Sequence, residues 1–170
     1  MPLLEHGRPV EDQFVVAAED GPLPGDAPAL IPLARLQREA EALAGRNVPL
    51  GIQVPSNARP EEIAPFLDRL ALVAIEFPKF RDGRGFTIAR TLRERHGYTG
   101  ELRAVGHILP DQYLFLVRCG FTSVAVPEGA DLTVWAAALG RFQVAYQPGV
   151  DGAPVISGLR RRLAGGGAVG

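Results

Sequence analysis

Strands and helices alternate regularly along the middle of this chain, and this alternation constrains the fold more than any other feature. The predicted strands are 50–55, 72–77, 101–106 and 121–126. The predicted helices begin after Pro60 and cover 84–97, 110–120 and 131–142. A strand that returns through a helix to a neighbouring strand pairs with it in parallel, and the crossover is almost always right-handed. The chain is therefore predicted to form a parallel α/β sheet.

The two faces of the predicted strands differ in polarity. One set of alternate positions is mostly large and apolar: Ile52, Val54, Val73, Ile75, Phe77, Leu102 and Val124. The other set is small or polar: Gly51, Gln53, Ala74, Glu76, Arg103, Ser123 and Ala125. A doubly wound sheet carries helices on both faces and needs apolar residues on both. We therefore expect a parallel four-stranded βα core that resembles half a (β/α) barrel, with helices on one face only.

The first 32 residues are predicted to add a short β region. One strand is expected at Asp12–Asp20 and a second at Ala29–Leu33, with the turn-rich sequence GPLPGDAP between them. A helix follows the second strand, and Gly45 ends it. These N-terminal strands, or a second subunit, are expected to cover the inner face of the half-barrel. A homo-oligomer is therefore one possible arrangement.

Length and composition indicate an ordinary globular protein. The chain has 170 residues, of which 46% are hydrophobic and 22% charged, so we expect one α/β domain over residues 1–163 with a core at about 30–147. A disordered tail is expected at 164–170. The net charge of −1 provides no overall field that would attract nucleic acid. The sequence shows neither a membrane-spanning run nor a secretory signal, so we expect a cytoplasmic protein that does not bind membranes.

The single cysteine limits metal and redox chemistry. Cys119 alone cannot close an internal disulfide, hold an iron–sulfur cluster or complete a tetrahedral zinc site. Neither a metal nor a cofactor is therefore expected. Leu116, Val117 and Phe121 flank this cysteine, so we expect it to be a buried structural residue rather than a nucleophile.

The most polar loops follow the predicted strands. In parallel α/β folds, sites form beyond the carboxyl ends of the strands, where these loops meet. The polar residues after the first strand are Ser56, Asn57 and Arg59, and those after the second are Lys79, Arg81, Asp82 and Arg84. The third strand is followed by His107, Asp111 and Gln112, and the fourth by Glu128. We therefore expect a polar rim at this edge of the sheet.

The segment EFPKFRDGRGF is predicted to bind an anion or a partner. The candidate binding residues are Lys79, Arg81, Asp82, Gly83, Arg84 and Gly85, with Asn57 and Gln112 from the neighbouring loops. The glycines precede a helix whose N-terminus can direct N–H groups at an anion, and the cations add charge-assisted donors. Phe77, Phe80 and Phe86 are expected to anchor the loop. The alternative, that DGRG is only a turn and a helix cap with solvated arginines, is about equally supported.

Two further groups of residues are weaker candidates. His107 and Asp111 are candidates for an acid or base, although a histidine at this position is more often a hydrogen-bonded loop residue. Glu76 and Arg103 lie on the polar face of neighbouring strands and are predicted to form a structural ion pair. The run Arg160–Arg162 is expected to be a solvated arm, with partner docking as the alternative.

The motifs FxDGRG, AR-x-LRER, GELRAVG, DQ and RCGF follow one another within residues 77–121. In this order they resemble an uncharacterised bacterial family, described as a domain of unknown function associated with sulfite reduction. Its members are encoded beside the haemoprotein of assimilatory sulfite or nitrite reductase, and some are labelled oxidoreductases. The likeness extends more loosely from about residue 30 to about residue 147. It implies sulfite reductase or its electron donor as a partner, and it provides no catalytic residues.

Two functions of different classes are consistent with these observations. The first is an accessory protein of assimilatory sulfite reduction, within sulfate assimilation and cysteine supply, whose basic rim loop binds a sulfur oxyanion or a reductase partner. The second is a small half-barrel enzyme that acts on an anionic metabolite with His107 or Asp111 as its acid–base group. A structural scaffold with no specific ligand is a third interpretation.

Overall fold

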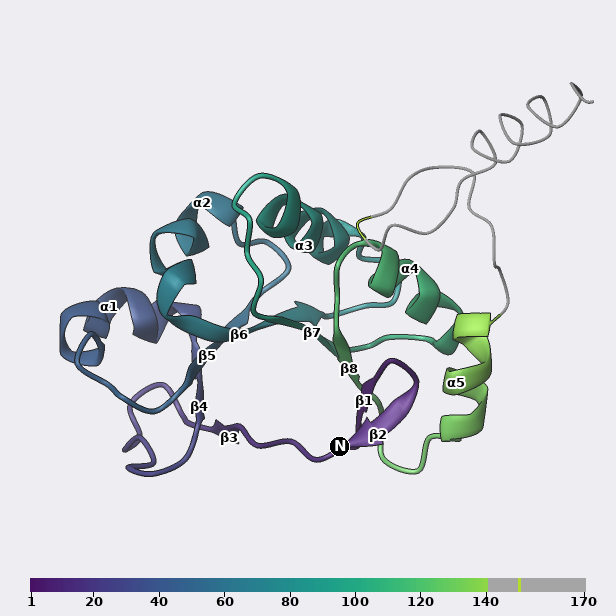
Figure 1. Ribbon diagram of the computed structural model, residues 1–170, viewed down its shortest axis with the longest axis horizontal. Coiled ribbons are helices and arrows are strands. Elements are labelled where there is room, and N and C mark those ends of the chain that lie inside the picture. Colours follow the sequence, from purple (N-terminus) through teal and green to yellow (C-terminus); the bar gives the residue numbers. More distant parts are fainter. Residues whose placement is uncertain (141–149, 151–170) are drawn as a thin grey trace, which may run out of the picture.

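The computed structural model describes residues 1–140 and Val150, and in it one curled sheet carries helices along its outer side (Figure 1). The strands are β1 (Leu3–Glu5), β2 (Arg8–Val10), β3 (Val15–Val16), β4 (Ala29–Pro32), β5 (Leu50–Val54), β6 (Leu70–Phe77), β7 (Glu101–Gly106) and β8 (Ser123–Ala125). The helices are α1 (Leu33–Leu43), α2 (Pro60–Ile63), α3 (Arg84–Glu94), α4 (Tyr113–Arg118) and α5 (Leu132–Gly140), with 3₁₀ turns η1 (Ala64–Arg69) and η2 (Pro110–Gln112).

The strands form a single eight-stranded sheet in the order β2-β1-β8-β7-β6-β5-β4-β3. β3 to β8 are parallel, whereas β1 pairs antiparallel with both β2 and β8. The predicted half-barrel architecture is confirmed, and the four predicted core strands are adjacent and parallel as β5 to β8. The sheet is nevertheless twice as wide as the predicted four-stranded core, because N-terminal strands extend both of its edges.

The outer face of the sheet packs against the helices and forms the main core. All the alternate positions predicted to be large and apolar are buried in it: Ile52, Val54, Val73, Ile75, Phe77, Leu102 and Val124. Burial of such side chains is the dominant favourable term in folding, at about 1.5–3 kcal/mol for each one. The strand alternation of the sequence therefore identified the helix-covered face correctly.

The inner face of the sheet holds a second, smaller apolar cluster. Leu30, Leu72 and Ala74 are buried there, and Phe14 and Val105 pack against them. The side chain of Phe14 comes from the connection between β2 and β3, which joins the two edge strands of the curled sheet. The N-terminal region thus covers part of the inner face, which was one of the two predicted coverings.

The first ten residues form a β-hairpin that sequence analysis did not predict. His6 and Gly7 both have positive φ values, 48° and 78°, which is the conformation of a two-residue type I′ turn. The register pairs Glu5 with Arg8 directly across this turn. The predicted strand at Asp12–Asp20 was too long, because only Val15 and Val16 pair with β4.

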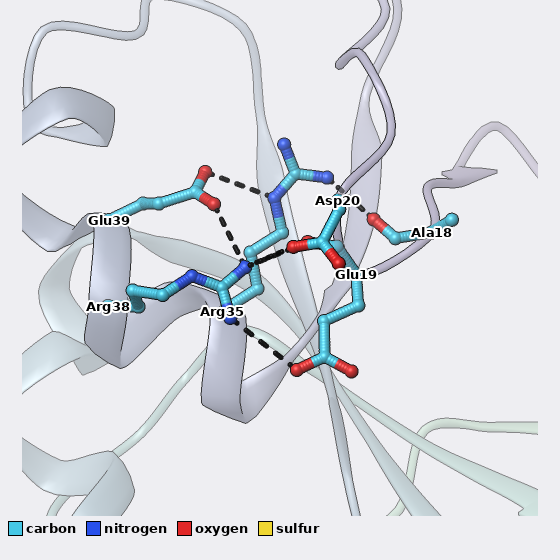
Figure 2. A network of polar contacts seen from close by, with 6 residues as sticks. All are labelled: Ala18, Glu19, Asp20, Arg35, Arg38 and Glu39. Carbon is cyan, nitrogen blue, oxygen red and sulfur yellow. Dashed lines mark hydrogen bonds and ion pairs between the residues drawn. The ribbon is translucent and has the colours of Figure 1, made fainter.

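Two arginines of α1 fix the segment that follows β3 (Figure 2). Arg35 is almost fully buried, and its Nη1 donates to the carbonyl of Ala18 at 2.6 Å while its Nε donates to Glu39 at 3.0 Å. Arg38 donates to the carboxylate of Asp20 at 3.0 Å. These contacts attach the segment after β3 to α1 and so hold this short strand at the edge of the sheet.

The helices agree with their sequence signals. α2 passes into the 3₁₀ turn η1 at Ala64, next to Pro65, which has no N–H to continue an α-helix. Asp131 caps α5, since its Oδ1 accepts from the backbone N–H of Thr133 at 2.9 Å. Among the described residues, no helix is long and apolar enough to span a bilayer. The predicted tail at 164–170, the domain end at residue 163 and the run Arg160–Arg162 lie outside the described residues.

Candidate binding surface at the carboxyl edge of the sheet

The loops after β6 and β7 are held together at the carboxyl edge of the sheet. The backbone N–H of His107 donates to the carbonyl of Phe77 at 2.7 Å. Gly106 makes this close approach possible: its φ is +101°, and a Cβ atom there would lie 2.5 Å from the carbonyl oxygen of Phe77. Only glycine adopts this conformation without strain. The ends of β6 and β7 are therefore in close backbone contact at the edge that carries the predicted rim.

Ser56, Asp82 and Arg84 form a compact polar cluster between the loops after β5 and β6. Ser56 Oγ donates to Asp82 Oδ2 at 2.8 Å, and Arg84 Nη2 donates to the same oxygen at 2.7 Å. Arg84 Nε and its backbone N–H both donate to Asp82 Oδ1, at 2.9 and 3.2 Å. Arg84 Nη2 also donates to Ser56 Oγ at 3.0 Å. The guanidinium is therefore already paired with a carboxylate of its own loop.

The environment of Asp82 holds its pKa well below the usual aspartate range, because Arg84 and Ser56 donate hydrogen bonds to the charged carboxylate. The same pair raises the pKa of Arg84. A carboxylate with a lowered folded-state pKa stabilises the fold above the unfolded-state pKa, about 3.9. This contribution disappears as the pH falls from there towards the folded-state value.

We expect Asp82→Asn to lower the melting temperature at pH 7, because the variant loses the ion pair. The difference in melting temperature between wild type and variant should shrink as the pH falls below about 4. In that range Asp82 becomes protonated in the unfolded wild-type protein, so its ionised form stabilises the fold less. Melting curves of both proteins between pH 7 and pH 3 measure this. A difference that stays constant over this range would show that the charge of Asp82 does not contribute.

The two glycines of the DGRG motif have different roles. Gly85 is buried, and a Cβ atom there would lie 2.7 Å from the Phe77 ring, so this glycine allows α3 to pack on β6. Gly83 has open space around its Cα and a φ of −80°. A side chain at Gly83 is therefore tolerated by the fold, whereas one at Gly85 is not.

The three phenylalanines of the segment do not act as one anchor. Phe77 is fully buried, and Phe86 packs on it with ring centroids 5.0 Å apart. Phe80, which was predicted to be a third anchor, is instead 46% exposed at the tip of the loop, under the guanidinium of Arg81. Phe77 is the last residue of β6 and faces the core, whereas Phe80 lies three residues beyond the end of this strand, in the loop.

Gln112 connects the loops after β6 and β7. Its Nε2 donates to the carbonyl of Phe80 at 2.8 Å, and its Oε1 accepts from the backbone N–H of Leu109 at 3.0 Å. The candidate acid–base residues His107 and Asp111 lie on the same β7 loop with exposed side chains. Within residues 1–140 and Val150, no hydrogen bond or ion pair positions either side chain.

The predicted rim is divided into two separate hollows. The first, of about 290 Å³, lies between the starts of α2 and α3 and is lined by Ser56, Asn57, Ala58, Arg59, Pro60, Arg84, Thr87 and Ile88. The second, of about 530 Å³, lies over the ends of β7 and β8 and is lined by Met1, Phe80, Gly106, His107, Ile108, Leu109, Pro127 and Glu128. The prediction that these loops lie at one edge of the sheet was correct, but it did not distinguish the two hollows.

The predicted ion pair between Glu76 and Arg103 is absent. Arg103 is buried and instead pairs with Glu101 at 2.9 Å on its own strand and with Asp12 at 2.8 Å from the N-terminal segment. The register explains the error, because Arg103 faces Ala74 across the β6–β7 ladder rather than Glu76. The ion cluster thus fixes the N-terminal segment to the inner face.

Arg93 is a structural residue of α3. Its Nε donates to the carbonyl of Gly120 at 2.9 Å, and its Nη1 donates to the carbonyls of Tyr98 and Gly100. The guanidinium also lies 5.5 Å from the Tyr98 ring centroid. Its position in the motif AR-x-LRER was the only signal of this role.

Cys119 is buried in the main core, as its apolar neighbours predicted. In the described part of the chain, no group of three or more His, Cys, Asp or Glu side chains is placed to hold a metal ion.

One protein family matches the part of the chain that forms this edge. A family described as bacterial proteins of unknown function (DUF934) matches residues 51–156, which is more than half of the chain. The chain belongs to the DUF934 family. The DUF934 region contains nearly all of β5 and the whole of β6, β7 and β8, with every loop of the candidate surface. The hairpin and the strands β3 and β4 lie outside it. A comparison with curated proteins gave no match.

Proposed function

We propose that this DUF934 protein is an accessory protein of assimilatory sulfite reduction that acts by binding a partner at the carboxyl edge of β5 to β8. The association with sulfite reduction rests on the ordered motifs of residues 77–121 and on the resemblance they carry. The binding role rests on the geometry of the edge, where loops from neighbouring strands present exposed cations beside a hollow.

The observation that carries the proposal is how the motif residues contribute to one edge. Asp82 and Arg84 of FxDGRG shape the loop after β6, and Gln112 of the DQ motif ties that loop to the one after β7. A rigid scaffold that presents fixed loops is the usual basis of a binding surface. The motifs therefore support a shaped surface rather than a set of reacting groups.

Binding is favoured over catalysis by the side chains that would carry a reaction. A general acid or base must lie within hydrogen-bond reach of its substrate proton and is usually oriented by a second group. The exposed side chains of His107 and Asp111 have no such orienting contact within the described residues. The geometry therefore supports an enzyme less well than a binding protein.

A protein partner is favoured over a small sulfur oxyanion by the state of Arg84. This arginine is the cation of the first hollow that lies next to the helix N-terminus, and Asp82 already neutralises it. Arg59, in the same hollow, pairs with Glu62 at 2.9 Å. An oxyanion would have to compete with two carboxylates for these donors, whereas Lys79 and Arg81 have no ion pair within the described residues.

We expect a strain without this protein to grow on sulfide but not on sulfate or sulfite as its sulfur source. The accessory role places the block at sulfite reduction, downstream of sulfate activation. Growth rates on the three sulfur sources measure this, with the wild-type gene supplied in trans as the control. Normal growth of the deletion strain on both sulfate and sulfite would contradict the proposed function.

A further inference from the structure

Exposed apolar side chains gather at the second hollow. Three of the eight large apolar residues exposed in the described part of the chain line it: Met1, Phe80 and Leu109. Phe80 is 46% exposed and Leu109 43%. Single exposed apolar residues are normal on a protein surface, but apolar side chains gathered around one hollow mark an interaction site.

The two loops that carry Phe80 and Leu109 are fixed before any partner arrives. The side chain of Gln112 binds the backbone of both residues, and the backbone of His107 is bonded to the end of β6. Loops that are already ordered lose little conformational entropy on binding. The hollow is therefore suited to direct docking without a folding step.

Two exposed cations flank Phe80 in the chain, and the guanidinium of Arg81 lies 5.2 Å from the centroid of the Phe80 ring. Lys79 and Arg81 are exposed on the loop after β6, and neither makes an ion pair within the described residues. Asp111 is exposed on the loop after β7, and Glu128 after β8 has an 86% exposed side chain. Glu128 lines the hollow on the β8 side and lies 3.7 Å from the N-terminal amine of Met1. Lys79 and Arg81 flank Phe80 on the β6 side, and β7 lies between β6 and β8 in the sheet.

We propose that this hollow docks an acidic segment of a protein partner. An apolar side chain of the partner packs between Phe80 and Leu109, and carboxylates beside it bind Lys79 and Arg81. A small anion would use the cations but not the apolar walls, and a basic segment would meet Lys79 and Arg81 first. The inference rests on the proposed function and adds the chemistry of the partner and the position of its contact.

Binding of purified sulfite reductase haemoprotein, and separately of its electron donor, tests the site by titration calorimetry. Phe80→Ala and Arg81→Glu should each raise the Kd of the binding partner about tenfold or more, because an interface aromatic and a complementary charge are lost. Two matched controls lie away from the hollow: Val134→Ala removes an exposed apolar side chain of α5, and Arg95→Glu reverses an exposed cation. Both should leave the Kd within about twofold. Melting curves must show that all four variants are folded.

A photo-crosslinking residue at position 80, used in cells, identifies the segment that occupies the hollow. We expect a crosslinked peptide rich in Asp and Glu with an apolar residue at its centre, and we expect Arg81→Glu to abolish the crosslink. A neutral or basic peptide, or no crosslink, would overturn the inference. Binding to the haemoprotein or donor that is unchanged by Phe80→Ala and Arg81→Glu would also overturn it and leave the proposed function standing. If the deletion strain grows normally and the crosslinked peptide is acidic, the proposed function is contradicted and the docking inference stands.

Discussion

Replacing Gly106 by alanine is expected to destabilise the protein by roughly 4 kcal/mol, because strain and overpacking each cost about 1–3 kcal/mol. The residue has a φ of +101°, and the new Cβ would lie 2.5 Å from the carbonyl oxygen of Phe77. Backbone atoms cannot move aside as a flexible side chain can. The hydrogen bond from His107 to that carbonyl would be displaced as well. Urea unfolding of wild type and variant measures the difference.

Gly83→Ala is the matched control, since it adds the same methyl group to the neighbouring loop. Gly83 has a φ of −80° and no atom near the position of its Cβ. This variant should change the free energy of unfolding by less than about 1 kcal/mol. If the two alanine variants unfold at the same urea concentration, the β6–β7 junction does not require glycine.

Removing the side chain of Arg93 is expected to cost about 3 kcal/mol of stability in Arg93→Ala, since hydrogen bonds to charged groups contribute roughly 1.5–3 kcal/mol each. The guanidinium donates to the carbonyls of Tyr98, Gly100 and Gly120. These carbonyls belong to the connections that lead into β7 and out of α4. Partial replacement of the arginine by water limits the loss to less than the sum of three bonds.

Arg90→Ala on the same helix serves as the control for helix propensity and net charge. Arg90 is exposed and, among the described residues, pairs only with Glu94, one turn along α3, at 2.8 Å. An exposed pair of this kind contributes about 0.3–0.5 kcal/mol. Thermal unfolding of both variants should therefore separate them clearly. Equal melting temperatures would show that Arg93 is not a structural clamp.

The central fold was predictable because two periodic signals agree in the sequence. Apolar alternation identified β5 to β8 and their buried face, and the helical spacing between them required parallel crossovers. At the edges of the sheet, β2 was not predicted and β3 was predicted too long, for a physical reason. β2 is exposed at all three positions and β3 consists of two exposed valines, so neither shows an alternation of buried and exposed residues. The turn at His6 and Gly7 was the available signal for the hairpin.

The candidate site was predictable in its location but not in its contacts. The rule that loops gather beyond the carboxyl ends of parallel strands placed Asp82, Arg84 and Gln112 at one edge. Which charges pair depends on register and side-chain direction, which one sequence does not contain. Arg103 therefore found Asp12 and Glu101 rather than Glu76. Phe80 was likewise predicted to be an anchor because it is a large apolar residue, but its place in the loop leaves it exposed.

The antiparallel pairing of β1 with β8 has a consequence for how the chain folds during synthesis. Leu4 pairs with Val124, so β1 is synthesised about 120 residues before its partner strand β8 exists. Contacts between such distant residues form late, because loop closure costs entropy before the contact repays it. Until then, β1 can pair only with β2, so its other edge stays open beside Leu3 and Leu4, which favours association with other chains. Slow translation of the segment that leads to β8 would lengthen this interval, and a chaperone that binds β1 would protect its open edge.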